Sequence, residues 1–139
     1  MIEIVPLELS HLDGVKVHTR QAAYQYLVDN GALTAECLAA WTVFDDDVVV
    51  AYGGLVETED GTAGWLLFSD RMEPRHLLPI YRTCKAVISD FAAGGDHMVF
   101  DMDLENPAIR RWADILKVQP LKTVHIEGAP HTRMIYEGP

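Results

Sequence analysis

The sequence predicts one α/β domain over residues 1–139, built on a mixed β-sheet. Hydrophobic residues make up 49% of 139 residues, enough for one core of ordinary size. Short runs of β-branched and aromatic residues alternate with helical stripes, in the order β-α-α-β-β-β-α-β-α-β-β. A helix between the fourth and fifth strands implies a right-handed crossover and a parallel pair within an otherwise antiparallel sheet.

The first elements are a strand and two helices. Residues 2–7 alternate weakly between apolar and polar, and Pro6 predicts the end of that strand. Apolar residues then recur at helical intervals over 11–30, where Asn30-Gly31 supplies a stop. Thr34 can cap a second short helix that carries Cys37, Leu38 and Trp41.

Three strands follow as a meander. Residues 41–44 and 48–57 are rich in β-branched and aromatic side chains, and Asp45-Asp46-Asp47 between them is typical of a turn. A second turn over 59–61 leads into a strand over 62–69 that we expect to be buried on both faces. Gly53-Gly54 within the second strand indicates a bulge or a close backbone approach.

The clearest helical stripe comes next, with Pro79 in its first turn and Gly94-Gly95 at its end. The stripe consists of Leu77, Ile80, Tyr81, Cys84, Val87, Ile88 and Phe91. A strand over 97–104 and a helix starting at Asn106-Pro107 follow. We expect the inner face of that helix to hold Ile109, Trp112, Ala113 and Leu116.

The last predicted element is a hairpin. Pro120 predicts the end of the preceding helix, and the hairpin strands cover 122–127 and 132–137. Gly128-Ala129-Pro130 forms the expected turn between them.

Charge and composition exclude several classes of function. The chain has 21 Asp+Glu against 11 Lys+Arg, a formal charge of −10, which repels nucleic acid and anionic lipid and favours a cationic partner, either an amine or a basic protein surface. Apolar runs are too short to cross a membrane, and the start does not resemble a signal peptide. Cys37 and Cys84 fit no ligand cluster and predict buried free thiols. We therefore expect a cytoplasmic protein; the oligomeric state is left open.

The stretch from Val99 to Leu116, VFDMDLENPAIRRWADIL, resembles the strand, Asn and helix segment of the GNAT N-acyltransferases. Together with the element order, the resemblance covers nearly the whole chain. It is closer to a small GNAT-like group of tailed phages, some of them internal virion proteins. The features that carry this are Gly31-Ala-Leu, the Gly53-Gly54 strand, Gly64-Trp65-Leu66-Leu67 running to Ser69-Asp70, and the helix after Asn106.

The resemblance implies a cleft where the fourth and fifth strands splay apart. Acetyl-CoA or another acyl-CoA would bind there, with its pantetheine paired against Leu67, Phe68 and Ser69, since unpaired backbone groups need a partner. Its pyrophosphate would lie at the turn over 70–76, where Arg71, Arg75 and His76 are the candidates for direct ion pairing. The resemblance also assigns Asn106 to the cofactor-binding residues.

The sequence departs from the family pattern at both ends of the expected cleft. The turn over 70–76 has no glycine, Pro74 donates no N–H, and Asp70 and Glu73 repel phosphate, so ordinary exposed arginines are the alternative interpretation. The tyrosine that protonates the leaving thiolate in many members falls at about Ala113, and the Gly-Phe that ends the helix is replaced near Lys117-Val118.

Carboxylates are the remaining catalytic candidates. Alternation places Asp101, Asp103 and Glu105 on one face of the fifth strand, either exposed to solvent or facing a positive group. Asp101, Asp103 or Glu57 could deprotonate an ammonium acceptor. Histidine spacing predicts no metal site, and no serine lies in a nucleophile elbow.

Two functions remain open. One is an acyl-CoA-dependent N-acyltransferase of phage type that acts on an amine. The other is a non-catalytic binding protein with the same fold, acting inside a virion or on a host protein, because a fold by itself does not carry function.

Overall fold

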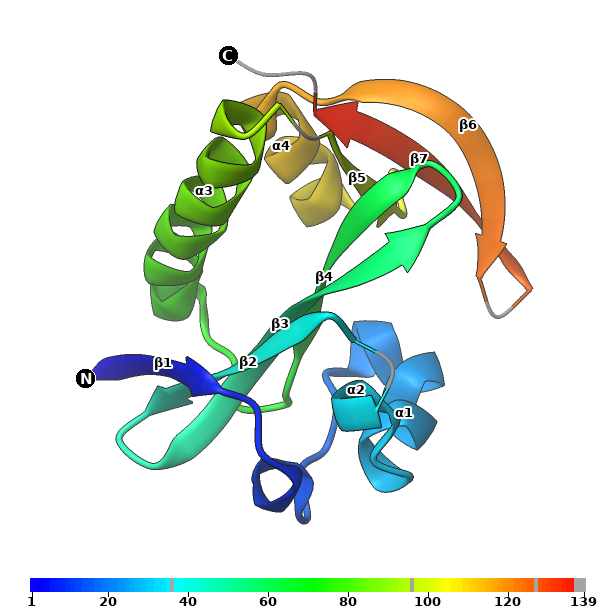
Figure 1. The fold of residues 1–139 in the computed structure, drawn as a ribbon. Helices are drawn as coiled ribbons and strands as arrows, with labels where there is room; N and C mark the ends of the chain where they lie inside the picture. The colour runs from blue at the N-terminus through cyan, green and yellow to red at the C-terminus, as the bar shows by residue number, and fades with distance from the viewer. Residues whose placement is uncertain (36, 96, 127, 137–139) are drawn as a thin grey trace. The chain divides into compact units, whose positions relative to one another are not determined.

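The computed structural model describes residues 1–35, 37–95, 97–126 and 128–136 (Figure 1). The chain divides into two compact units, and each is described by itself. Unit 1 comprises Met1–Val56 and Trp65–Arg82, and unit 2 comprises Glu57–Gly64 and Thr83–Pro139. The single domain over residues 1–139 stays a prediction.

The strands are β1 Ile2–Pro6, β2 Ala39–Asp45, β3 Val48–Thr58, β4 Gly61–Phe68, β5 Met98–Met102, β6 Gln119–Ile126 and β7 Ala129–Tyr136. The α-helices are α1 Gln25–Asp29, α2 Ala32–Ala35, α3 Leu77–Ala93 and α4 Pro107–Leu116, and the 3-10 helices are η1 Leu9–Leu12, η2 Thr19–Tyr24 and η3 Pro74–His76. The strands form a seven-stranded sheet in the order β1-β2-β3-β4-β5-β7-β6. The predicted mixed α/β class is confirmed.

The parallel pair that the crossover predicts is present within unit 2. Thr62 of β4 pairs with Met98 of β5, and Ala63 pairs with Val99. On the other side of β5, β7 runs antiparallel, with Asp101 directly opposite Arg133. The register therefore brings an acidic and a basic side chain together on the neighbouring strands β5 and β7. The splay between β4 and β5 stays a prediction.

The hairpin between β2 and β3 in unit 1 turns on two aspartates. Asp46 and Asp47 have φ of 47° and 71°, the left-handed region that a two-residue hairpin turn requires and that aspartate tolerates better than most residues. The predicted turn is confirmed. A bulge lies between Val43 and Phe44, where the register with β3 shifts.

The core of unit 1 gathers around Tyr52 of β3. Its buried members are Leu12, Val17, Val28, Leu33, Tyr52 and Leu67. The Tyr52 hydroxyl donates to the backbone oxygen of His11 at 2.7 Å, so the one polar atom of this ring is paired, and burial raises the Tyr52 pKa above its ordinary range.

The helix predicted over 11–30 is wrong in its extent. The chain is helical at η1, breaks at Gly14 with φ of +68°, and is extended at Val17, which forms an antiparallel bridge with Ser69. Helical structure resumes at η2 and ends with α1 before Gly31, whose φ of +72° confirms the predicted stop. Apolar spacing alone could not reveal that the middle of this stretch pairs with a distant strand.

The second helix is also shorter than predicted. It is α2, and its first N–H, at Ala32, donates to the side chain of Asn30 at 2.9 Å, so Asn30 takes the role expected of Thr34. Trp41 lies in β2 instead, and Leu38 is exposed. Nothing is described for residue 36 or for the side chain of Thr34.

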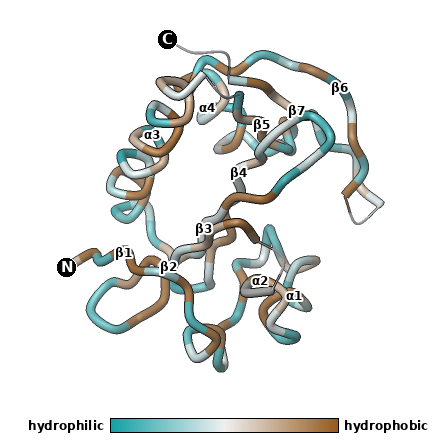
Figure 2. The backbone as a smooth tube through the Cα atoms, in the orientation of Figure 1, coloured by the Kyte–Doolittle hydropathy of each residue, from teal (hydrophilic) through white to brown (hydrophobic). Residues whose placement is uncertain are grey.

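Helix α3 matches its prediction. It begins at Leu77 with Pro79 in its first turn, and Gly95 follows its end with φ of +82°. Hydrophobic and hydrophilic residues alternate around its turns (Figure 2), and Ile80 and Ile88 are buried. Among the described residues, no helix is both long and apolar enough to cross a membrane.

Helix α4 in unit 2 begins at Pro107 as predicted, and Ala113 and Leu116 are buried on its inner face. It ends because Lys117 adopts φ of 58°, the conformation that glycine usually supplies, and not because of Pro120. Val118, the next residue, is buried.

The final hairpin is longer than predicted (Figure 1). Pro120 lies inside β6, next to a register shift between Pro120 and Lys122. Ala129 and Pro130, which were predicted to form the turn, belong to β7 instead. Ala129 pairs with Ile126, and Pro130 pairs with His125. The predicted strand ends at Glu127 and Glu137 lie outside the described residues. The fifth strand ends at Met102, earlier than the predicted Leu104.

Candidate functional site

The end of β4 and the turn over 70–76 form the first candidate region, in unit 1. Ser69 is 1% exposed, and its hydroxyl donates to the Val49 backbone oxygen at 2.7 Å and accepts from the Arg71 N–H at 3.1 Å. Leu67 is buried in the core of the unit. Both side chains therefore hold the strand end together, and the pairing of pantetheine with the backbone of residues 67–69 stays a prediction.

Asp45 of β2 binds two basic side chains of this turn. Its Oδ2 lies 2.8 Å from Nη2 of Arg75 and 2.9 Å from Nε2 of His76, which is 2% exposed. The hydrogen bond with His76, then the amino group of Met1 and then Arg75, holds the Asp45 pKa well below its ordinary range. The predicted cation Arg75 is thus committed to a carboxylate.

Glu73 also binds Arg75. Its Oε2 accepts from Arg75 Nε at 2.7 Å, which lowers the Glu73 pKa and raises that of Arg75. The Glu73 N–H donates to His76 Nδ1 at 2.9 Å, which starts η3 in the manner of a capping box. Arg71, the other predicted cation, has an exposed side chain.

Five backbone amides of the turn donate within the chain. Asp70 N–H donates to Lys16 O at 2.8 Å, Met72 N–H to Ser69 O at 3.2 Å, and His76 N–H to Glu73 O at 2.9 Å. The Arg71 and Glu73 amides bond the side chains already named, and Pro74 has no N–H. A pyrophosphate cradle needs such amides to point at the anion. The residues of this turn therefore do not fit the pyrophosphate of an acyl-CoA.

The second candidate region, in unit 2, contains the predicted carboxylates. Asp101 accepts two hydrogen bonds from Arg133, Oδ1 from Nε at 2.8 Å and Oδ2 from Nη2 at 3.0 Å, as their facing positions on β5 and β7 allow. Arg133 also donates from Nη1 to Asp60 Oδ2 at 2.7 Å. These hydrogen bonds, those to Asp101 first, raise the Arg133 pKa further.

Asp60 and Lys122 extend this network. Lys122 Nζ lies 2.7 Å from Asp60 Oδ2 and 2.7 Å from Glu59 Oε1. Hydrogen bonds from Lys122 and then Arg133 lower the Asp60 pKa, and those to Asp60 and Glu59 raise the Lys122 pKa. The carboxylate of Asp101 therefore belongs to an internal network of charges.

The other two carboxylates lie apart from this network. Asp103 lies beyond the end of β5, and its Oδ1 accepts from the Glu105 N–H at 3.1 Å, so the predicted alternation of Asp101, Asp103 and Glu105 on one strand face is wrong. Glu57 accepts from the Thr62 hydroxyl at 2.8 Å. The three predicted bases are not brought together, and their catalytic role stays a prediction.

Asn106, the last predicted cofactor residue, starts α4. Its backbone oxygen accepts from the Arg110 N–H at 3.0 Å, and its own N–H donates to Asp103 O at 3.1 Å. Its assignment to a cofactor stays a prediction.

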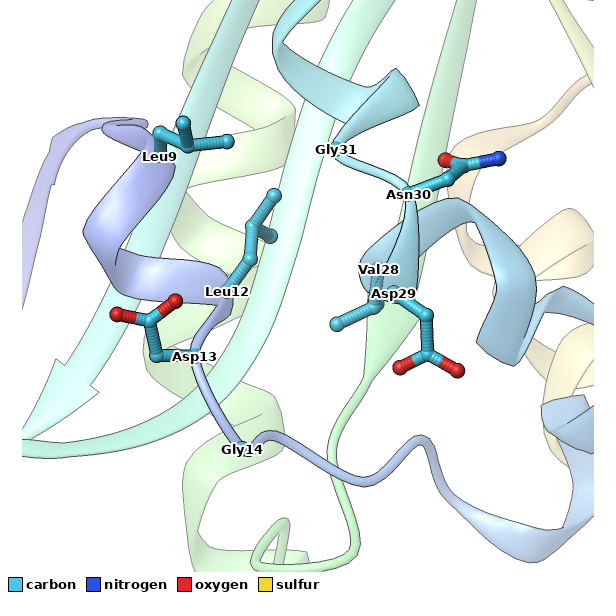
Figure 3. A pocket seen from close by; sticks show the side chains of 8 residues that line it. All are labelled: Leu9, Leu12, Asp13, Gly14, Val28, Asp29, Asn30 and Gly31. Carbon is cyan, nitrogen blue, oxygen red and sulfur yellow. The ribbon is translucent and has the colours of Figure 1, made fainter.

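Each unit also contains a pocket. In unit 1 a pocket of about 380 Å³ lies between η1 and the turn after α1, with Leu12 and Val28 at its buried side and Asp13 and Asp29 beside it (Figure 3). In unit 2 a pocket of about 340 Å³ is lined by Glu57, Asp60, Gly61, Thr62 and His97. Within the described residues, no group of three or more His, Cys, Asp or Glu side chains could hold a metal ion.

The sequence did not identify Asp45 as the partner of Arg75, Arg133 as the partner of Asp101, or Gln21, whose carboxamide bonds the backbone of Leu66 and Phe68. Arg133 faces Asp101 through strand register, and Asp45 meets Arg75 across a long separation in sequence, and neither is written in one sequence. Gln21 had no signal, because the helix predicted around it hid its contact with β4.

No protein-family model matches the sequence, and no curated protein is significantly similar to it. Solved structures do match, and several of them are acetyltransferases. The ribosomal-protein-S18-alanine N-acetyltransferase from Escherichia coli is 13% identical, with a TM-score of 0.65 over 97% of this chain and 91% of that one. The chain therefore has the fold of the GNAT acetyltransferases.

Two further structures agree. Spermidine N-acetyltransferase SpeG from Vibrio cholerae is 11% identical, with a TM-score of 0.61 over 96% of this chain and 92% of that one. YncA from Salmonella typhimurium, whose structure contains acetyl-CoA, is 13% identical, with a TM-score of 0.65 over 96% and 92% of the two chains. At these identities the likeness concerns the fold alone.

Proposed function

We propose that this chain is a GNAT-fold binding protein that acts by contact with a positively charged partner rather than by acyl transfer. The observation that carries the proposal is the turn over 70–76, where five backbone amides and the Arg75 and His76 side chains are bonded within the chain. A fold that has lost its anion cradle keeps its surfaces, and those can bind something else.

The expected partner is cationic, because a formal charge of −10 attracts basic surfaces over distance. The pocket of unit 1 is the candidate contact, since it combines apolar Leu12 and Val28 with the carboxylates of Asp13 and Asp29. The alkyl stem and charged end of a lysine or arginine side chain suit such a lining. Action in a virion or on a host protein remains part of this proposal, as does the phage origin.

Acyl transfer is the second candidate, and the acetyltransferase identity of the fold neighbours favours it. Glu57 would then be the candidate base, because it lines the pocket of unit 2 and is bonded by a hydroxyl rather than held in the Arg133 network.

Acetyl-CoA separates the two candidates. We expect no rise in melting temperature and no heat of binding at about 1 mM acetyl-CoA, and no acetylated product from a panel of amines, since any ligand that binds the native state stabilises it. A thermal shift together with an acetylated amine would reject the binding proposal in favour of transfer.

A basic peptide tests the contact itself. We expect a lysine- and arginine-rich peptide to bind by calorimetry at low salt, and binding to weaken when Asp13→Asn and Asp29→Asn are combined. The matched control combines Asp90→Asn and Asp114→Asn, which makes the same charge change on exposed positions of α3 and α4. If both double variants weakened peptide binding equally, the binding would reflect overall charge attraction, and the pocket of unit 1 would be rejected as the contact.

A further inference from the structure

The side of β4 that faces away from β3 is bonded to another part of unit 1. The Ser69 N–H donates to Val50 O of β3 at 3.0 Å. Backbone groups of successive strand residues point to opposite sides, so those of Leu66 and Phe68 point away from β3. This is the side on which Thr62 and Ala63 pair with β5, and it is where the resemblance assigns pantetheine.

Residues 16–18 pair with this side of β4 as a short antiparallel strand. The His18 N–H donates to Phe68 O at 2.8 Å, and the Asp70 N–H donates to Lys16 O at 2.8 Å, on either side of the Val17–Ser69 bridge. The Val17 side chain is buried in the core cluster that includes Leu67. The contact is thus both hydrogen-bonded and anchored by apolar packing.

The side chain of Gln21 continues the pairing. Its Nε2 donates to Leu66 O at 3.0 Å, and its Oε1 accepts from the Phe68 N–H at 2.8 Å. A carboxamide has an N–H donor and an oxygen acceptor, as a peptide group does. The Gln21 side chain can therefore replace the next pair of backbone hydrogen bonds that a neighbouring strand would make. The amide of a bound ligand would need these same two backbone groups.

Gln25 holds the segment from its other side. The Val17 N–H donates to Gln25 Oε1 at 2.8 Å, and Gln25 Nε2 donates to Val15 O at 3.0 Å. Residues 15–18 therefore lie between the Gln25 carboxamide and β4. The backbone groups of Val15 and Val17 bond Gln25, and those of Lys16 and His18 bond the end of β4. Such double anchoring fixes the segment against the strand.

We propose that residues 15–21 are a built-in occupant of this side of β4 and block it to acyl-CoA or any other extended ligand. The proposal concerns the state of one strand and stands whether or not the protein proves to bind a basic partner. In this proposal Gln21 occupies the backbone groups of Leu66 and Phe68, and Gln25 holds residues 15–17 in place.

Amide hydrogen exchange in the whole protein tests the proposal. In the unmodified chain, we expect the amides of Phe68 and His18 to be protected to a degree similar to that of Ser69. In Gln21→Ala the Phe68 amide loses its acceptor and should exchange on the order of tenfold faster. Ser69, bonded to β3, should keep its protection and serves as the internal control, and Arg20→Ala, a change of the exposed neighbour, should alter neither amide.

A second variant guards against unfolding. Gln21→Asn keeps the carboxamide but is one methylene shorter, so it should expose the Phe68 amide in the same way. Rapid exchange of Phe68 in the unmodified protein, or an unchanged rate in both folded variants, would overturn the proposal. So would a loss of His18 protection when acetyl-CoA at about 1 mM raises the melting temperature, because the cofactor would then displace the segment.

This outcome is distinct from failure of the proposed function. An acetylated amine formed while Phe68 stays protected would reject the binding role and leave the occupied strand in place. Rapid exchange of the Phe68 amide together with no acetylated product would reject the occupied strand and leave the binding role in place.

Discussion

The arginines of the two charge networks lie at different depths. In unit 1 the Arg75 side chain is 63% exposed and binds Asp45 and Glu73. In unit 2 the Arg133 side chain is 10% exposed and binds Asp60 and Asp101. Each arginine binds two carboxylates, so the depth of the guanidinium, and not the number of its partners, distinguishes the two networks. Removing the buried arginine should therefore cost more than removing the exposed one.

The largest expected effect comes from removing Arg133. This side chain is buried, and Arg133→Met leaves two poorly exposed carboxylates without their shared cation. Breaking a buried pair in this way costs about 3 kcal/mol. Urea unfolding at neutral pH measures it as a lower midpoint with an unchanged slope.

Lys122→Met is the matched control, because Lys122 binds Asp60 from a more exposed position. We expect a much smaller loss from it. If both variants lose equally, burial of the guanidinium does not set the strength of the unit 2 network.

Close packing of glycine against an aromatic ring also differs between the units. A Cβ on Gly54 in unit 1 would overlap the ring of Trp65, whereas one on Gly64 in unit 2 would lie 2.8 Å from the edge of Phe100. We expect Gly54→Ala to destabilise by about 2 kcal/mol, within the usual cost of overpacking, and Gly64→Ala by less.

Gly53→Ala is the control within the same strand, since its nearest contact is a flexible Leu66 methyl at 3.3 Å. Thermal unfolding of the three variants should rank them Gly54, Gly64, Gly53 from the largest loss to the smallest. A Gly53 variant as unstable as Gly54 would mean that strand conformation, and not the Trp65 ring, sets the cost.

The smallest expected effect is a change in pH dependence at Asp45. The pKa of this carboxyl is lowered below 3.8 in the folded protein, so its contribution to stability is present above about pH 4 and is lost as pH falls through the folded pKa. Asp45→Asn should therefore flatten the fall in melting temperature below about pH 4.

Asp47→Asn, a change in the exposed turn next to Asp45, is the control for that experiment. It should keep the steep acid limb of the unmodified protein. An equally steep limb in Asp45→Asn would assign the acid sensitivity to other carboxyls.

The sequence predicted the element order, α3, α4 and the aspartate turn because each depends on local signals: a helical stripe, Asn-Pro, and residues that tolerate positive φ. It misjudged residues 11–30, since the apolar spacing of Leu12, Val15 and Leu27 fits a helix while hydrogen bonds to β4 decide the structure. It found the carboxylates and arginines of the candidate regions but not their partners, which depend on register and on contacts distant in sequence.

Pro120 has a consequence outside both candidate regions. It lies in β6, the last strand of the sheet order, beside a shift of register. An outermost strand with a missing amide and an irregular ladder is a poor template for another copy of the chain. This edge of the sheet is therefore less suited to intermolecular strand pairing, the first step of fibrillar aggregation, than a regular strand would be.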